Sequence, residues 1–584
     1  MPLLLLLIMP LGGCSGYSSG AHTTPAAPVS PGTPVNPTTP DAPKISSFAA
    51  NPPSINSGQS VTLTWQTSGA TSLQINNVTA TLASSSSSMV VAPAATTTYT
   101  LTATNSAGST QQSATVTVSA LPTIAEVQID PAATAQPISP NFLGLGHVMG
   151  DVLSMIGTSA SNMNPIYEQL LKNLTQYANA PILIRELTEG SDPADLFAAP
   201  RLAALSQLNA DVGAQYMVGI DFLDDDVSTA TTETQQLVDG LPKKAFKGIE
   251  VGNEPDLYGA NGERPADWDY TQYLADYQKF APAVLAASGG VKLEAPVWAG
   301  LTPGFMNNLN SFVAAQASQL AFVTVHHYPG GVCNGATEPA DYLLTEAAVD
   351  GDTQPLTGPV EISQYMTAAQ AAGIPFRIGE LNSISCGGQL GVTNSFSSAL
   401  WAMDISFAYA KVGVSGVNFF APGDPYTVNP YAPFDFNSTI GQGGVRTYAV
   451  RDINPLYYGL LLFAQAVQNK AQLLPVALTT QGNIKTWATI DANRTIRVLL
   501  LNKDEAASGP VSISLNGYGA ASVTRLTAPS YSSTTGVMLG GQTFDGSADG
   551  TPQGAAYSES NAAESGVYTV TLPAVSAALV TIQP

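Results

Sequence analysis

Between residue 122 and about residue 470, short apolar runs alternate with longer stretches of helical periodicity. This alternation predicts parallel βα units, because consecutive parallel strands must be joined by a crossover that is usually a helix. There are eight such runs, the number of strands in a closed (β/α)8 barrel, which we expect over residues 121–470. Its strands should end near Leu145, Ile184, Ile220, Gly252, Pro296, Val325, Ile378 and Phe419.

Two flanking regions show period-two alternation, which is typical of half-buried strands separated by turns. Residues 44–120 predict a small β-sandwich with Trp65 in its core, and they resemble a bacterial immunoglobulin-like module. Residues 471–584 predict a second β-sandwich after the barrel. The chain is therefore expected to be multi-domain, with a sandwich on each side of the barrel.

The first residues belong to neither pattern. Residues 1–10 are an apolar run too short to span a bilayer, and Leu-Gly-Gly-Cys (11–14) resembles a bacterial lipobox. We expect residues 1–14 to be a signal peptide and Cys14 to be lipidated, which would anchor an exported protein to the bacterial envelope. An ordinary cleaved signal, giving a secreted or periplasmic protein, is the alternative. Residues 15–43 are rich in Pro, Ser and Thr and predict a linker.

The chain is strongly acidic. It has 42 Asp and Glu against 20 Lys and Arg, a formal net charge of −22. This excess of negative charge argues against nucleic acid, anionic membrane surfaces and long sulfated polysaccharides as partners. Contact with a membrane is expected only through the lipid anchor.

Two glutamates stand at the ends of predicted barrel strands. Glu254 follows the fourth strand and is preceded by Asn253, and Glu380 follows the seventh. The catalytic residues of such barrels lie at the carboxyl ends of the strands. Glycosidic cleavage needs one carboxyl group to protonate the departing oxygen and a second to attack the anomeric carbon, and a nearby amide can bind the sugar 2-hydroxyl. The pair therefore predicts a glycosidase acting on a carbohydrate.

Three stretches resemble glycoside hydrolase family 79, which contains β-glucuronidases and heparanase: Val-Gly-Asn-Glu-Pro (251–255), Val-Thr-Val-His-His-Tyr (323–328) and Gly-Glu-Leu-Asn-Ser-Ile-Ser-Cys-Gly-Gly (379–388). The likeness covers roughly residues 122–584. It implies a retaining enzyme with Glu254 as acid/base, Glu380 as nucleophile, Asn253 on the 2-hydroxyl and Tyr328 orienting the nucleophile. It also implies that residues 124–129 pack in the C-terminal sandwich.

The resemblance further implies how the C6 group of the sugar is held. Family 79 grips a uronate carboxylate with the backbone amides of a glycine loop and a tyrosine, here Gly387, Gly388 and Tyr426. Backbone amides can hold an anion without Lys or Arg, which is compatible with the acidic composition. The expected function is therefore an exo-acting β-glucuronidase that removes terminal β-D-glucuronosyl residues.

Three positions depart from the family pattern, namely Val148, Ser385 and Cys386. These differences keep a neutral-sugar exo-β-glycosidase on the same barrel open as an alternative. A non-catalytic, glycan-binding surface lipoprotein is a second alternative, suggested by the anchor, the linker and the first sandwich.

Cys333 and Cys386 follow the sixth and seventh strands, so both loops open on the same rim. In an exported protein this favours a disulfide, with two buried free thiols as the alternative. We expect no metal and no cofactor, because the cysteines and the histidines His147, His326 and His327 lack zinc-ligand spacing. His326 and His327 alternate on one strand, so one of them can face the pocket. We expect this to be His327, at the rim and in contact with substrate.

Overall fold

The computed structural model describes residues 40–80, 82, 87–188, 197–351, 355–423 and 429–584. Cys14, the expected lipidation site, lies outside these residues. The chain divides into two compact units, residues 1–120 and 121–584. Within the described residues, no helix is both long and apolar enough to cross a membrane.

The first unit is built from two small sheets, with strand orders β1-β3-β5 and β2-β7-β6-β4. Alternate residues of β3 point inward, so that Val61, Leu63 and Trp65 are buried together. The alternation in the sequence thus arises because each strand presents one face to the core. The strands are β1 (Lys44–Asn51), β2 (Ser54–Asn56), β3 (Val61–Ser68), β4 (Ser72–Ile75), β5 (Ser87–Val91), β6 (Thr97–Asn105) and β7 (Gly108–Ser119).

The second unit contains a closed barrel of eight strands, and every neighbouring pair in it is parallel. The predicted barrel is therefore confirmed. Strands such as β13 and β16 are buried along their whole length, because one face packs in the barrel and the other lies under helices. The strands are β10 (Leu143–Val148), β13 (Leu183–Leu187), β14 (Gln215–Ile220), β15 (Phe246–Val251), β16 (Leu293–Trp298), β17 (Leu320–His327), β19 (Phe376–Leu381) and β21 (Gly416–Phe420).

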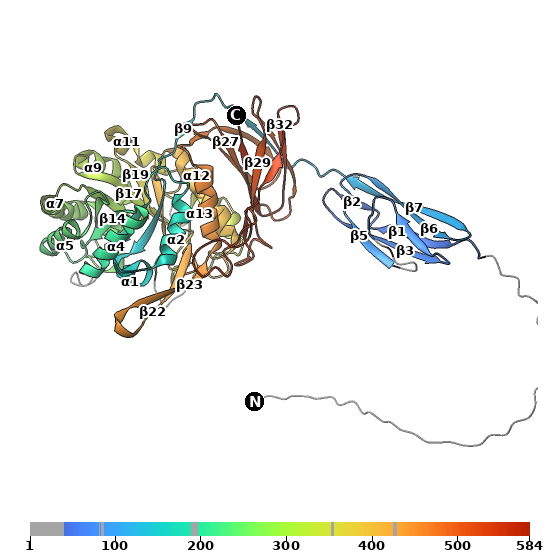
Figure 1. The fold of residues 1–584 in the computed structure, drawn as a ribbon. Coiled ribbons are helices and arrows are strands. Elements are labelled where there is room, and N and C mark those ends of the chain that lie inside the picture. The colour runs from blue at the N-terminus through green and yellow to red at the C-terminus, as the bar shows by residue number, and fades with distance from the viewer. Residues whose placement is uncertain (1–39, 81, 83–86, 189–196, 352–354, 424–428) are drawn as a thin grey trace, which may run out of the picture. The chain divides into compact units, whose positions relative to one another are not determined.

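Helices cover the outside of the barrel (Figure 1). One of them begins at a capping box: Asp269 accepts hydrogen bonds from the N–H groups of Thr271 and Gln272, and the Gln272 side chain accepts one from the Asp269 N–H. The longer helices are α2 (Pro165–Thr175), α4 (Ala199–Val212), α5 (Val227–Gly240), α7 (Tyr270–Ala287), α9 (Leu309–Gln316), α12 (Phe396–Val412) and α13 (Pro455–Ala466), and the shorter ones are α1 (Val152–Met155), α6 (Tyr258–Asn261), α8 (Pro303–Met306), α10 (Ala347–Asp350) and α11 (Thr367–Ala372).

Two sheets form the C-terminal β-sandwich. One has the order β30-β29-β33-β27-β26-β24-β9, with β31 paired to β29, and the other has the order β25-β8-β28-β32. Residues preceding the barrel thus contribute β8 and β9 to this sandwich. The strands are β8 (Ala125–Ile129), β9 (Gln136–Pro137), β24 (Gln472–Leu474), β25 (Val476–Thr480), β26 (Ile484–Ile490), β27 (Ile496–Asn502), β28 (Gly509–Ser514), β29 (Ala521–Thr527), β30 (Met538–Leu539), β31 (Glu559–Asn561), β32 (Val567–Leu572) and β33 (Ser576–Ile582).

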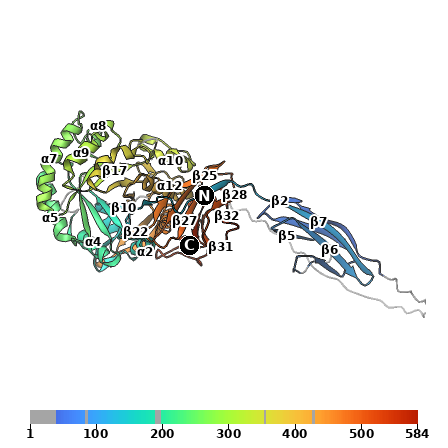
Figure 2. The same cartoon turned by 90° about the horizontal axis from the view of Figure 1, so that it is seen from above.

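The barrel and the C-terminal sandwich are packed against each other through α12 and α13. Asp404 of α12 accepts hydrogen bonds from Trp487 Nε1 at 3.0 Å and from Lys503 Nζ at 2.7 Å, and the Trp487 ring stacks on Phe407. Both views of the ribbon show α5, α7 and α9 on the side of the barrel away from this sandwich (Figures 1 and 2).

Candidate active site

Glu254 and Glu380 come together at the carboxyl ends of β15 and β19. A carboxylate oxygen of each lies within 4.8 Å of the other. Glu254 adopts a left-handed backbone conformation with φ of 50°, and its N–H donates to the Val297 carbonyl at 3.0 Å. Such strain in a non-glycine residue is a feature found at functional sites. The backbone thus turns sharply after β15 and aims this side chain toward β19.

Two side chains hold the Glu380 carboxylate from opposite sides. The Tyr328 hydroxyl donates to Oε1 at 2.6 Å, and the Arg185 guanidinium donates to Oε2 at 2.5 Å. Charge-assisted hydrogen bonds of this length are strong and directional. Glu380 is therefore fixed in one orientation before any substrate binds.

Arg185 is the hub of this site, although the sequence analysis did not single it out. It comes from β13, is fully buried, and donates twice to Glu250 and once to Asn253 Oδ1 in addition to its bond with Glu380. Burial opposes the charge of Arg185, but the carboxylates of Glu250 and Glu380 outweigh it and raise its pKa. A single cation thus orients the amide of Asn253 and the carboxylate of Glu380.

The surroundings of Glu254 favour its protonated form. Burial raises its pKa, the cation of Arg185 opposes that rise and Glu263 adds to it, with a net value of about 7. Its Oε1 lies 2.8 Å from Nδ1 of His326. Burial lowers the pKa of His326 to about 3, so this imidazole is neutral at ordinary pH. A carboxyl group with a pKa near 7 is suited to general acid and base catalysis.

The expectation for His327 is wrong. His327 is fully buried, and its Nδ1 pairs with the hydroxyl of Tyr409 on α12, at 2.5 Å. It points outward into the helical layer, whereas His326 faces the site. The signal was present in the sequence, because residues two apart on a strand share a face and Tyr328 was already expected beside Glu380. His326 is two residues before Tyr328 and therefore faces the same side.

The rim carries the two cysteines and the glycine loop. Cys333 and Cys386 form a disulfide, and the short strands β18 (Gly330–Gly331) and β20 (Ile384–Ser385) pair beside it. Gly387 and Gly388 both have positive φ, and a Cβ on Gly388 would lie 2.6 Å from the Tyr431 ring. Tyr431 was not predicted. Burial, and after it the charge of Glu380, raises the pKa of Tyr431. Tyr426 lies outside the described residues.

A further buried pair lies between the barrel strands β10 and β13 and helix α2. His147 Nδ1 lies 3.3 Å from Oε1 of Glu186, and its Nε2 lies 3.4 Å from the Tyr167 hydroxyl. Val148, the departure from the family pattern, is half-buried at the end of β10. Glu186 follows Arg185 on β13 and therefore faces the opposite way, so this imidazole–carboxylate pair belongs to the helical layer and not to the site.

The atoms of Glu254, His326 and Glu380 are close enough together to ligate a metal ion. Carboxylate and imidazole groups are common ligands of divalent cations. In this geometry, however, Arg185 already donates to Glu380, and a cation placed between the glutamates would be repelled by that guanidinium. The arrangement fits proton transfer and nucleophilic attack by two carboxyl groups.

Comparison with known proteins adds three kinds of likeness. Residues 486–579 match the model of the glycosyl hydrolase family 79 C-terminal β domain. A β-glucuronidase from Aspergillus niger is 25% identical over 301 residues, which cover 47% of this chain and 52% of that protein. A β-glucuronidase from Neurospora crassa is 28% identical over 245 residues, covering 36% and 41%. The chain thus spans about half the length of the curated relatives it matches, or less.

Solved structures show the same fold. A 4-O-α-L-rhamnosyl-β-D-glucuronidase from Fusarium oxysporum superposes with a TM-score of 0.61 at 20% identity, over 78% of this chain and all of that one. A family 51 α-L-arabinofuranosidase from Bifidobacterium longum gives 0.53 at 15% identity, over 79% of this chain and all of that one. The family model thus matches part of the C-terminal β-sandwich, and the likeness to the two β-glucuronidases covers less than half of this chain.

Proposed function

We propose that the chain is a retaining β-glycosidase of the β-glucuronidase type. The observation that carries this proposal is the spacing of Glu254 and Glu380, whose carboxylate oxygens approach within 4.8 Å. Retaining glycosidases hold their two carboxyl groups about 5–5.5 Å apart, whereas inverting enzymes separate them by about 6.5–9.5 Å to leave room for a water. The pair is therefore arranged for double displacement.

In the first step the carboxylate of Glu380 attacks the anomeric carbon while the bond to the leaving oxygen breaks and Glu254 gives that oxygen its proton. In the second step Glu254 takes a proton from water, the water attacks the same carbon, and Glu380 is released. Arg185 and Tyr328 hold the Glu380 carboxylate in a fixed orientation for its attack. The pKa of about 7 lets Glu254 act as acid and then as base.

A glucuronide is the substrate class we favour. The support is the likeness to two β-glucuronidases, together with the glycine loop at Gly387 and Gly388 beside Tyr431. Amides of such a loop can bind a carboxylate without a basic side chain.

Export and lipid anchoring belong to this proposal as well. Its support is the apolar start, the sequence around Cys14, and the disulfide between Cys333 and Cys386, since disulfides persist in oxidising compartments. Metabolic labelling with a fatty acid, lost in Cys14→Ser, would test the anchor.

The test of the activity uses soluble protein without residues 1–43 and matched nitrophenyl β-glycosides of glucuronate, galacturonate, glucose and xylose. We expect the largest kcat/KM for the glucuronide. Preference for glucose or xylose would replace the proposal with a neutral-sugar glycosidase, and turnover of none of them by a folded protein would favour a non-catalytic glycan-binding role.

A further inference from the structure

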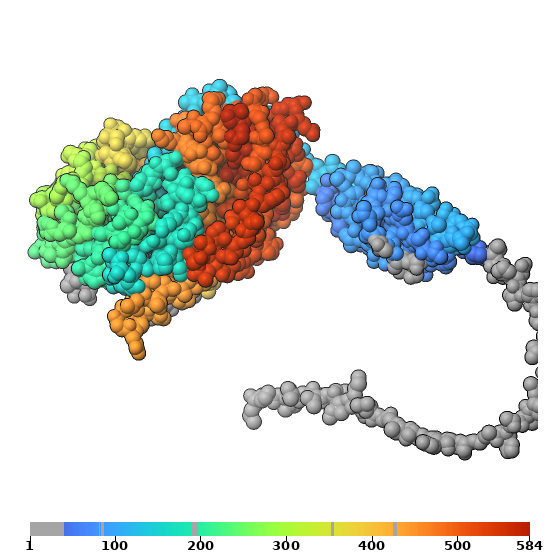
Figure 3. Space-filling view, in the orientation of Figure 1, coloured from blue at the N-terminus to red at the C-terminus, as the bar shows by residue number. Residues whose placement is uncertain are grey.

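A second cavity lies where α2 and α13 meet the C-terminal sandwich. It measures about 320 Å3, and its walls include Tyr177, Gln465, Thr524 and Tyr557. Ligand pockets begin at about this size, roughly 300 Å3. We call it the seam cavity. Figure 3 shows the teal surface of the α2 region against the red surface of the C-terminal sandwich.

The seam cavity is separate from the candidate active site. Helix α2 runs back from the carboxyl end of β10 to the start of β13, so Gln176 and Tyr177, which follow it, lie toward the amino ends of the strands. Tyr177 also borders the residues 139–142 that precede β10. Glu254 and Glu380 lie at the opposite end of the barrel. A ligand in the seam cavity would not touch either carboxylate.

The walls of the seam cavity are uncharged. Every described residue that lines it is polar neutral, aromatic, aliphatic, glycine or proline. By contrast, the cavity of about 170 Å3 beside Glu254 also contains Asp221 and Glu263. In a chain of net charge −22, a neutral cavity at a seam disfavours ionic ligands, because they would have no partner there.

Several polar side chains in these walls make no hydrogen bond within the described residues. Among the described residues, the side chains of Gln465, Thr524 and Ser558 and the hydroxyl of Tyr177 have no hydrogen-bond partner. They offer hydroxyl and amide groups that both donate and accept. Such groups match the ring of hydroxyls on a sugar, whereas an apolar ligand would leave them unpaired at a cost in free energy.

Two aromatic rings complete the cavity. Tyr557 is 65% exposed, and the described residues contain no other phenylalanine, tyrosine or tryptophan as exposed as this one. Tyr177, at the other wall, is half-buried, and that burial raises its pKa. A tyrosine ring presents an apolar face with a polar tip, so it can stack on the C–H face of a pyranose while its hydroxyl bonds the rim of the sugar.

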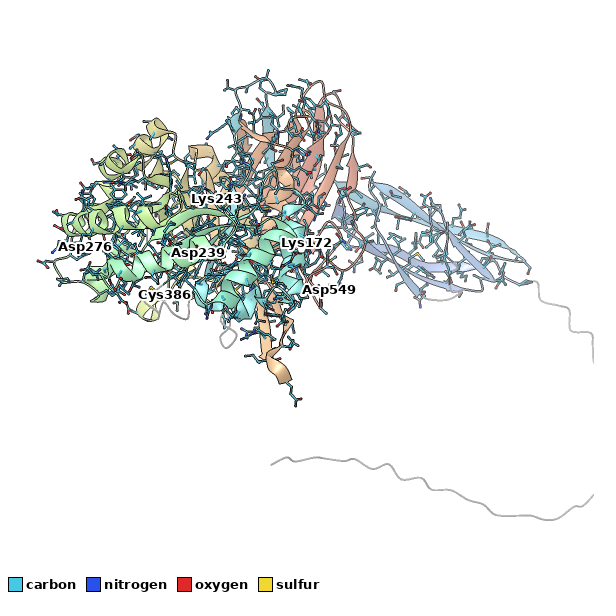
Figure 4. The ribbon with its side chains drawn as sticks, turned by 60° about the vertical axis from the view of Figure 1, so that its left-hand side comes forward. Lys172, Asp239, Lys243, Asp276, Cys386 and Asp549 are labelled. Atoms are coloured by element: carbon cyan, nitrogen blue, oxygen red, sulfur yellow. A yellow bond between two sulfur atoms is a disulfide. The ribbon has the colours of Figure 1, made fainter. Side chains whose placement is uncertain are left out.

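The wall is held in place by the packing around it. The Asn173 amide donates to the Gly550 carbonyl at 2.8 Å, which ties α2 to the loop that leads to Tyr557, and the Tyr557 N–H donates to the Gly540 carbonyl at 2.6 Å. Lys172 on α2 and Asp549 in that loop mark this side of the molecule in Figure 4. The cavity is thus shaped before a ligand enters.

We propose that the seam cavity is a secondary binding site for a neutral saccharide. Its size, its uncharged walls, its free amide and hydroxyl groups and its exposed Tyr557 all fit one or two uncharged sugar rings. The site would hold the enzyme to a neutral glycan chain while the cleft at Glu254 acts elsewhere. It stands independently of the proposed activity.

The experiment measures binding of xylotetraose, cellotetraose and β-1,4-galactotetraose by calorimetry, with tetragalacturonate as the charged counterpart. We expect at least one neutral tetrasaccharide to bind, and Tyr557→Ala and Gln465→Ala each to weaken it at least tenfold. Met538→Ala is the matched control, because Met538 is an exposed neighbour on β30 that does not line the cavity. Turnover of nitrophenyl glucuronide should be unchanged in Tyr557→Ala.

Three results would overturn the proposal: no binding of any neutral tetrasaccharide, undiminished binding by Tyr557→Ala, or equal binding of tetragalacturonate. The second result would place the sugar in the catalytic cleft. If nitrophenyl glucuronide is not hydrolysed at all, the proposed function fails. The binding data still test whether the seam cavity binds a neutral saccharide.

Discussion

His326 and Glu254 share a hydrogen bond of 2.8 Å, and the pKa values of the two groups move in opposite directions. Burial takes the pKa of His326 down to about 3 and that of Glu254 up to about 7. The imidazole therefore stays neutral where the carboxyl group titrates. The proton that leaves this pair near neutral pH belongs to Glu254.

This relationship predicts the pH dependence of the reaction. The first step needs Glu254 protonated, and its raised pKa means that the proton is kept below about pH 7 and lost above it. We expect kcat/KM for nitrophenyl glucuronide to fall as the pH rises through about 7. The basic limb should disappear in Glu254→Gln, measured with an activated leaving group. If kcat/KM of that variant still falls above about pH 7, the fall is caused by a residue other than Glu254.

The two glutamates should respond differently to the leaving group. Glu254→Gln removes the proton donor, so it should slow substrates with poor leaving groups by about 10²–10⁴-fold and activated aryl glycosides far less. Glu380→Gln removes the nucleophile and should slow all substrates. The measurement is kcat/KM over a series of aryl glucuronides of increasing leaving-group pKa. Parallel losses in both variants would show that the roles are misassigned.

Arg185 should act on catalysis through Glu380 and Asn253. Arg185→Lys keeps the charge but cannot reproduce the planar fork, so we expect kcat to fall by about 10²-fold or more. Arg377→Lys is the control, because Arg377 is also buried and lies on the same strand as Glu380, but it bonds Asn418 and backbone carbonyls. Both variants should lose stability in urea unfolding. Equal losses of kcat would mean that Arg185 is only structural.

The disulfide closes a loop between positions 53 residues apart. Chain-entropy reasoning gives roughly 4 kcal/mol for a loop of this length, and removed native disulfides typically cost about 2–5 kcal/mol. We expect the double variant Cys333→Ser/Cys386→Ser to lose stability of this order in denaturant unfolding and to raise KM, because the bridge lies next to Gly387 and Gly388. Alkylation of the denatured, unreduced wild-type protein should leave both cysteines unmodified. Their modification would show free thiols instead.

Stability should depend on pH through Glu294. Burial and the neighbouring Glu250 raise its pKa to about 8. A carboxyl group with a raised folded pKa stabilises the fold at low pH, and this contribution is lost as the pH rises through about 8. We expect a lower Tm at pH 8.5 than at pH 6.

Glu294→Gln should reduce this difference in Tm, since the amide cannot ionise. The difference should not vanish, because burial also raises the pKa of Glu233 and Asp256 to about 7. A pH dependence identical to that of the wild-type protein would exclude Glu294 as a source.

The barrel could be predicted because its strands are buried on both faces and so leave mainly apolar runs. The prediction for residues 124–129 agrees with the pairing of β8 between β25 and β28. The charged residues inside those runs carry a further signal, which the prediction of the site did not include. Arg185, Glu250 and Glu294 each interrupt an apolar strand, and buried charges are generally paired, so their meeting inside the barrel could have been anticipated.

Other parts of the site carried weaker signals. The choice between His326 and His327 depends on strand parity, and a register shift between Val325 and His326 shows how easily that parity is misjudged. Tyr431 lies in irregular backbone after β21, where no periodicity indicates which side chain turns back toward Glu380. Local pattern specifies strands well, but loop residues depend on tertiary contacts that a single sequence does not display.

The position of β8 has a consequence for how the chain is assembled. Because this strand precedes the barrel and yet hydrogen-bonds to β25 and β28 beyond it, the barrel is enclosed in sequence between two pieces of one sandwich. The sheet containing β8 cannot close until β25, β28 and β32 have left the ribosome. A cut between barrel and sandwich would leave β8 on the barrel fragment without its partners β25 and β28, so we expect residues 121–584 to unfold as one cooperative unit.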